Sequence, residues 1–213
     1  RFNPANRRGG GTGRMTELVL VRHGITDWNA ARRLQGQRDI PLNDDGRALV
    51  DAWRFSPPYD AVDLSVSPLV RCRETADIIK SNNPGLGDIT YDDRLLERDM
   101  GIWAGRDLRA VETEFGDAAH DGGYRPEGGE SRRDMLVRTR DFIAATATGG
   151  RPRLVVTHRG VIRAFYAIAT GWDLTGETAD ELSRRRAQVF RAAADGSVEV
   201  AQLNLRLTAP TAN

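Results

Sequence analysis

The segment after the first apolar run of the chain combines an arginine, a histidine and a glycine. Residues 18–21 are a short run of leucine and valine typical of a buried strand, and Arg22, His23 and Gly24 follow it directly. A guanidinium binds phosphate oxygens, glycine lets a ligand approach the backbone, and a neutral imidazole is a nucleophile at physiological pH. The segment suits attack of His23 on phosphorus, although an inert strand end with surface charges has the same composition.

Two other predicted strands also end at polar side chains. Residues 62–66 precede Ser67, with Arg71 a few residues further on, and residues 153–157 precede His158. In sheets of parallel strands, ligands bind beyond the carboxyl ends of the strands. The three polar groups are therefore expected to meet at one site.

The elements that must position these groups alternate between strands and helices, which is typical of an α/β protein with a largely parallel sheet. Asn43 and Ser67 are expected to cap helices, because their side-chain oxygens accept backbone N–H groups. The predicted strands are 18–21, 62–66, 89–91 and 153–157, and the predicted helices are 44–55, 68–81, 107–115, 131–146 and 161–170. Residues 188–192 and 198–203 are expected to form a closing hairpin.

The composition is that of a globular protein. The chain has 213 residues, of which 39% are hydrophobic and 29% charged, enough for one sizeable domain with a core. No apolar stretch is long enough to cross a bilayer, and no signal-peptide pattern occurs. Because the single Cys72 cannot form an internal disulfide, we expect a reducing, cytoplasmic location.

Residues 1–14 differ from the rest of the chain. They hold four arginines, no acidic residue and a glycine-rich stretch, so we expect a disordered leader of vector or upstream origin, with Met15 as the natural start. One domain is then expected over 15–213. Of the total net charge of +1, the part from Met15 carries −3, so the domain lacks the basic excess of a nucleic-acid-binding protein.

Several blocks of the sequence, taken together, resemble the histidine phosphatase superfamily in its phosphoglycerate-mutase-like branch. They occur in the order of that family and extend from about residue 17 to 163, most of the chain. The blocks are RHGITDWN at 22–29, LQG at 34–36, SPLVRCRETA at 67–76, LE at 96–97, GGES at 128–131 and THRGV at 157–161.

The resemblance implies a three-layer α/β/α sandwich with a mostly parallel central sheet. It also implies a covalent phosphohistidine intermediate that needs no metal and no other cofactor. His23 would be the nucleophile and Glu97 the proton donor, with Arg22, Arg71 and His158 around the transferring phosphoryl group. Further contacts to substrate or phosphate would come from Asn29, Gln35, Gly36 and Arg159.

Arg159 departs from the family pattern, which usually has a small residue at this position. The side chains of Arg159 and of Arg163, one helical turn later, either reach a second anionic group of the substrate or point to solvent. Arg132 and Arg133 are another candidate anion contact.

The phosphoglycerate mutases of this family carry a lysine eleven residues after the acid and a longer insertion with paired arginines. This chain has Leu108 at that lysine position, and Arg125 is the single arginine of the glycine-rich loop that follows. We therefore expect a phosphomonoester hydrolase, with residues 107–129 as a substrate lid.

The expected partner is a small phosphorylated metabolite, with no nucleic acid and no membrane, bound by a monomer or homodimer. A sugar phosphate, a phosphoglycerate derivative and ribazole phosphate all remain open as substrates. A cofactor-dependent phosphoglycerate mutase is the first alternative. A non-catalytic phospho-ligand binding protein is the second, and the presence of both histidines and Glu97 argues against it.

Overall fold

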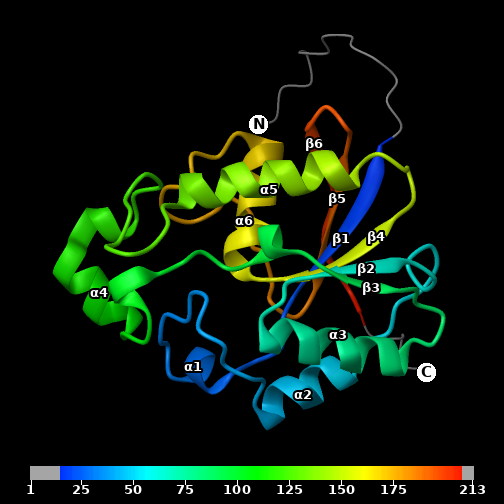
Figure 1. Ribbon diagram of the computed structural model, residues 1–213, viewed down its shortest axis with the longest axis horizontal. Helices are drawn as coiled ribbons and strands as arrows, with labels where there is room; N and C mark the ends of the chain where they lie inside the picture. Colours follow the sequence, from blue (N-terminus) through cyan, green and yellow to red (C-terminus); the bar gives the residue numbers. More distant parts are fainter. Residues whose placement is uncertain (1–14, 208–213) are drawn as a thin grey trace.

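The computed structural model describes residues 15–207, so the predicted leader at 1–14 lies outside the described part of the chain. Four strands run parallel to one another: β1 (Thr16–Arg22), β2 (Asp63–Val66), β3 (Ile89–Tyr91) and β4 (Arg153–Thr157). Strand β5 (Ala187–Ala192) runs antiparallel to β1 and to β6 (Val198–Leu205). The sheet order is β3-β2-β4-β1-β5-β6 (Figure 1), which confirms the mostly parallel sheet.

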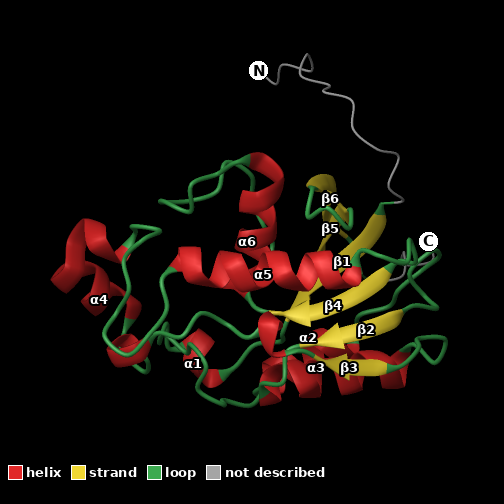
Figure 2. Ribbon diagram, turned by 45° about the horizontal axis from the view of Figure 1, so that its top comes forward, coloured by secondary structure: helices red, strands yellow, loops and turns green. Residues whose placement is uncertain are grey.

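Helices cover both faces of this sheet, so the predicted three-layer architecture is confirmed (Figure 2). Helices α2 (Asp44–Asp51) and α3 (Val70–Asn82) pack on one face, and α5 (Arg132–Thr146) and α6 (Arg159–Thr170) pack on the other. The short α1 (Asp27–Ala30) and α4 (Leu108–Phe115) lie beyond the carboxyl ends of the parallel strands. Within residues 15–207, no helix has the length and apolar character needed to span a membrane.

Strand β1 is buried on both faces, and its side chains divide between two cores. Val19 and Val21 pack with the residues of α2 and α3, whereas Leu18 and Leu20 pack with α5 and α6. This division follows from the two-residue period of a strand. A central strand packed in this way holds its carboxyl end, and the residues after it, in a fixed place.

Helix α2 ends at Asp51, four residues before the predicted end. The chain turns there because Trp53 and Phe55 enter the core, where they are 2% and 8% exposed. The Phe55 N–H donates to Asn83 Oδ1 at 2.9 Å, which fixes this turn against the end of α3. Burial of two aromatic side chains outweighs continuation of the helical pattern.

The prediction that Ser67 caps the next helix is wrong. Helix α3 begins at Val70, whose N–H donates to Asp39 Oδ1 at 2.6 Å, so the cap comes from a distant loop. The Ser67 hydroxyl instead lies 2.8 Å from Nε2 of His158. A residue type that suits a cap locally is used for a tertiary contact.

One unpredicted helix and one early helix start lie close to the expected site. The four-residue α1 was not predicted. Thr26 and Asn29 form a capping box at its start. Helix α6 begins at Arg159, two residues earlier than predicted, directly after His158. Both changes place a helix start next to the residues that were expected to form the site.

The segment predicted as a lid has its own small apolar cluster beyond the sheet. Helix α4 and the 3-10 helix η3 (Gly116–Ala119) contribute Val111 and Ala119, which pack around the buried Trp103. The rings of Trp103 and Tyr124 are stacked with centroids 5.3 Å apart. This cluster lies apart from the two cores that cover the sheet.

Candidate active site

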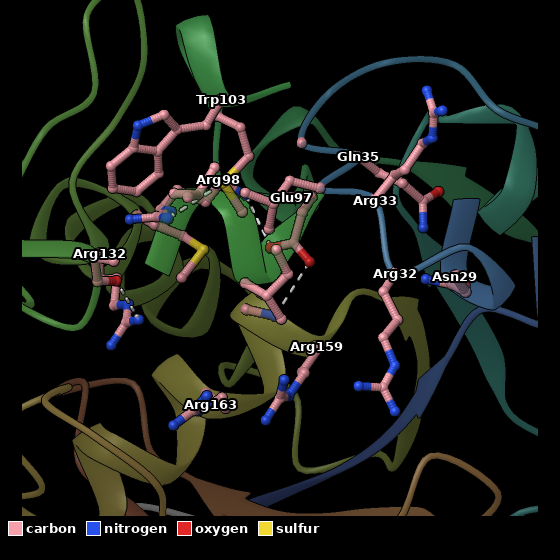
Figure 3. A pocket seen from close by; sticks show the side chains of 18 of the residues that line it. Asn29, Arg32, Arg33, Gln35, Glu97, Arg98, Trp103, Arg132, Arg159 and Arg163 are labelled. Carbon is pink, nitrogen blue, oxygen red and sulfur yellow. Dashed lines mark hydrogen bonds between the residues drawn. The ribbon is translucent and has the colours of Figure 1, made fainter. Parts of the chain in front are cut away.

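A cavity of about 380 Å³ lies beyond the carboxyl ends of the parallel strands (Figure 3). Every residue predicted for the site lines this cavity except His158, which is fully buried. The predicted residues in the wall are Arg22, His23, Asn29, Gln35, Gly36, Arg71, Glu97 and Arg159. Of the additional anion-contact candidates, Arg132 and Arg163 line the cavity, whereas Arg133 lies against Gly123 outside it.

His23 is held by backbone contacts on both sides. The backbone N–H of His23 donates to the Thr157 carbonyl at 3.0 Å, which connects His23 to the end of β4. Its Nδ1 lies 2.7 Å from the Gly24 carbonyl oxygen. Because a carbonyl accepts but cannot donate, Nδ1 carries the hydrogen and Nε2 keeps a free lone pair. The ring is therefore in the tautomer that a nucleophile requires.

The surroundings of His23 also keep its ring uncharged. Burial, and then the positive charges of Arg22 and Arg71, hold the pKa of His23 well below its usual value. Burial lowers the pKa of Arg22 to about 9, so Arg22 remains a cation at neutral pH. A neutral imidazole thus lies next to fixed positive charge.

Arg71 is fully buried in the first turn of α3, and its guanidinium is oriented by backbone carbonyls. One terminal nitrogen donates to the Arg38 carbonyl at 2.7 Å and the other to the Gly36 carbonyl at 2.8 Å. Its Nε has no protein partner in the described part of the chain. A buried N–H group without a partner in the wall of a cationic cavity suits an anionic ligand.

His158 lies behind His23, with 5.2 Å between the two ring centroids. Its Nε2 is 2.8 Å from Ser67 Oγ and 3.5 Å from the buried Cys72 sulfur. Burial, followed by the charge of Arg71, lowers the pKa of His158 well below its usual value. In the free protein His158 is therefore an uncharged ring at neutral pH.

The Glu97 carboxylate is positioned by two backbone N–H groups. Oε1 accepts the N–H of Arg98 at 2.9 Å, and Oε2 accepts the N–H of Gly160 at 3.3 Å, in the first turn of α6 (Figure 3). A Cβ atom at residue 160 would come within 2.1 Å of Oε1. The glycine of the THRGV block is therefore required for this carboxylate to lie against α6.

Asn29, Gln35 and Gly36 form one side of the cavity. Asn29 uses Oδ1 to accept the Thr26 N–H in the capping box of α1. Gln35 is buried, and its Oε1 has no partner among residues 15–207. Gly36 has a φ of +53°, a conformation that favours glycine, and it presents the carbonyl that holds Arg71.

The structure adds arginines that the sequence reasoning missed. The wall of the cavity contains nine arginines and three glutamates, with no lysine and no aspartate. Arg98 follows the predicted acid directly, which is a signal that could have found it. Arg184 lies in an irregular segment between α6 and β5, and nothing in its local sequence indicates the site. The missed arginines are Arg32, Arg33, Arg98 and Arg184.

This arrangement can bind and activate an oxyanion. Fixed guanidinium groups attract and orient a phosphate, and they offset the charge that develops on its oxygens during transfer. A neutral imidazole with a free Nε2 and a carboxylate are present in the same cavity. Among residues 15–207, no three His, Cys, Asp or Glu side chains are gathered as ligands for a metal ion.

Comparisons with known proteins agree with this geometry. A probable phosphoglycerate mutase GpmB of Salmonella paratyphi C is 36% identical over 153 residues, which cover 66% of this chain and 69% of that protein. The structure of a mycobacterial glucosyl-3-phosphoglycerate phosphatase with VO3 is 25% identical and superposes with a TM-score of 0.72, covering 89% of this chain and 99% of that one. YhfR of Bacillus stearothermophilus, also 25% identical, gives a TM-score of 0.76 over 91% and 98% of the two chains.

The sequence profile of the histidine phosphatase superfamily (branch 1) matches residues 18–196. This range contains every helix, strands β2 to β5, most of β1 and all the cavity residues described above, whereas β6 lies beyond its end. The chain belongs to branch 1 of the histidine phosphatase superfamily.

Proposed function

We propose that this protein hydrolyses a small phosphomonoester through a phosphohistidine intermediate on His23, without a metal. The observation that carries the proposal is the contact between His23 Nδ1 and the Gly24 carbonyl, which leaves Nε2 free in an arginine-lined cavity. The same contact stabilises the ring after phosphorylation, because the Nδ1–H group of a positively charged ring donates more strongly to a carbonyl.

The reaction has two displacements. Nε2 of His23 attacks phosphorus, the bond from phosphorus to the ester oxygen breaks, and the Glu97 carboxyl group gives its proton to the leaving alcohol. The resulting carboxylate then takes a proton from water as that water attacks phosphorus, and the P–N electron pair returns to Nε2. Arg22 and Arg71 offset charge on the phosphoryl oxygens in both steps.

Hydrolysis is favoured over mutase activity by the lid. A mutase must hold the bisphosphoglycerate intermediate while that intermediate reorients in the site, and this needs additional positively charged side chains. Leu108 lies in the cavity wall at the position where the mutases of this family carry a lysine. The similarity to a mycobacterial glucosyl-3-phosphoglycerate phosphatase supports the same choice.

A phosphoglycerate mutase is the second candidate, because the curated relative at 36% identity is named a probable phosphoglycerate mutase. In that case phosphorylated His23 gives its phosphoryl group to a second hydroxyl of the phosphoglycerate instead of to water, and it takes back the first phosphoryl group from the bisphosphoglycerate so formed. The two reactions share His23 and Glu97 and differ only in the acceptor.

The test is turnover of p-nitrophenyl phosphate in EDTA by the wild type and by the His23→Ala variant. We expect hydrolysis that persists in EDTA and falls by at least about 10³-fold in the variant, because the nucleophile is lost. Arg140→Ala, exposed on α5 outside the cavity, is the control and should match the wild type. Loss of wild-type activity in EDTA would refute the metal-free mechanism. Isomerisation of phosphoglycerate without phosphate release would establish the mutase.

A further inference from the structure

Two of the cavity arginines that serve no step of the proposed reaction lie together on α6. Arg159 and Arg163 are four residues apart on α6, so they lie on the same face of the helix. Figure 3 shows them next to each other on the cavity wall. Both approach one carboxylate oxygen of Glu177, Arg159 at 3.2 Å and Arg163 at 3.6 Å. The pair therefore binds a carboxylate in this structure.

Arg163 is built into the wall. Its side chain is only 14% exposed, and its guanidinium lies 4.7 Å from the ring centroid of Trp172. It also donates to the Gly176 carbonyl. Burial, together with the charge of Arg159, lowers its pKa to about 10, so it is charged at neutral pH. Arg159 is 53% exposed and has room to adjust to a ligand.

Glu177 is held far less firmly than the arginines it contacts. Its side chain is 79% exposed, and in the described part of the chain its carboxylate bonds only to these two arginines. Exposed ion pairs contribute about 0.2–1 kcal/mol, so a ligand can displace this carboxylate at little cost. The contact shows which chemical group the arginine pair accepts.

This pair lies close to the reacting centre. Arg159 precedes Gly160, whose N–H binds the Glu97 carboxylate. Arg163 is one helical turn further along, roughly 6 Å by the rise of an α-helix. A small substrate with its phosphoryl group at His23 can therefore place a second anionic group at the pair.

We propose that Arg159 and Arg163 form a carboxylate subsite, filled by Glu177 in the free protein and by the substrate during turnover. The substrates are then phosphomonoesters that also carry a carboxylate. This inference rests on the proposed hydrolase function, and it assigns the far end of the substrate rather than the reaction.

The test compares two pairs of esters that differ in a carboxylate: 3-phosphoglycerate with glycerol 3-phosphate, and 4-carboxyphenyl phosphate with phenyl phosphate. For the wild type we expect kcat/KM to favour the carboxylated ester at least about tenfold in one pair or both. Arg159→Gln and Arg163→Gln should bring this preference close to one. Glu177→Gln should raise kcat/KM for the preferred carboxylated ester about two- to fivefold, since it removes the internal competitor.

The ratio of kcat/KM for the carboxylated ester to kcat/KM for its partner separates a specificity role from a structural one. If Arg163 only supports the fold, Arg163→Gln lowers kcat/KM equally for both esters of a pair. The preference then survives, which would overturn the proposal. The exposed Arg159 gives an independent variant, and Arg140→Gln on α5 is the matched control, expected to keep the wild-type preference. Hydrolysis of all four esters with no preference refutes the subsite and leaves the hydrolase intact. No hydrolysis of any ester refutes the proposed function and, with it, this inference.

Discussion

At the scale of single residues, the reactivity proposed for this site depends on where hydrogens lie. The Gly24 carbonyl accepts from Nδ1 of His23, and two backbone N–H groups hold the Glu97 carboxylate. Neither arrangement uses another side chain, so neither depends on a partner that titrates. The nucleophile and the acid therefore keep separate roles within one cavity.

The role of Glu97 is tested by Glu97→Gln. With an alkyl phosphate such as glycerol 3-phosphate we expect kcat to fall by about 10²–10⁴-fold, because the leaving alkoxide receives no proton. With p-nitrophenyl phosphate the leaving group needs no proton, so phosphorylation persists while hydrolysis of the intermediate slows. Rapid mixing should then show a burst of p-nitrophenolate close to the enzyme concentration. Glu199→Gln, exposed on β6, is the control; an equal loss on both esters without a burst would contradict the acid–base role.

At the scale of elements, part of the cavity wall comes from segments that lie outside the sheet. Arg132, at the start of α5, joins two of them. Its guanidinium donates to the Ala119 and His120 carbonyls on the lid side and to the Leu174 carbonyl on the other, at 3.2, 3.0 and 2.6 Å. One side chain thus links the predicted lid to the segment that carries Glu177.

Removal of this link should loosen both segments without unfolding the domain. For Arg132→Gln we expect the free energy of local opening to fall by about 2 kcal/mol, since several charge-assisted hydrogen bonds are lost. Hydrogen exchange of the His120 and Asp121 amides should then speed up roughly 30-fold, with little change in the urea midpoint. The neighbouring Arg133→Gln is the matched control, because Arg133 lies against Gly123 outside the cavity. Equal exchange in the two variants would contradict the linking role.

At the scale of the whole molecule, two buried histidines make stability depend on pH. Burial and neighbouring arginines hold the pKa of His23 and of His158 below the value in an unfolded chain, about 6.5. The unfolded state therefore binds more protons than the folded state below that pH. The stabilisation is complete above about pH 6.5 and is lost as the pH falls from there toward the folded-state pKa values.

We expect the free energy of unfolding to fall by up to about 1.4 kcal/mol per pH unit for each histidine between pH 6.5 and 5. Urea titrations at several pH values measure this slope. His23→Gln should reduce this slope by up to about 1.4 kcal/mol per pH unit, the share of one titrating histidine. Ile143→Ala, on the buried face of α5, should lower the free energy of unfolding at every pH and keep the slope. A slope unchanged by His23→Gln would show that this histidine does not titrate with unfolding.

Much of the fold follows from local patterns in the sequence. The uninterrupted apolar run at residues 18–21 predicts a buried strand, and the order of strands and helices predicts the parallel sheet. Because such a sheet brings the carboxyl ends of its strands together, the placement of Arg22, His23 and His158 near one another could also be predicted. The resemblance to the histidine phosphatase superfamily indicated Glu97 and Arg71 as well.

Other features depend on contacts between segments far apart in the chain. A helical pattern could not show that Trp53 turns into the core, and a capping residue could not show that Ser67 contacts His158 while Asp39 caps α3. Arg184 and Glu177 reach the cavity only because the segment after α6 folds back over it.

The sequence by itself determined the periodicity of the elements, the mostly parallel sheet and the gathering of Arg22, His23 and Arg71 beyond its strands, because these depend on local side-chain patterns and on strand direction. Only the tertiary structure decided the tautomer of His23, the backbone donors to Glu97 and the arginine pair bound to Glu177. These depend on distances of a few ångströms between loops, and packing sets those distances.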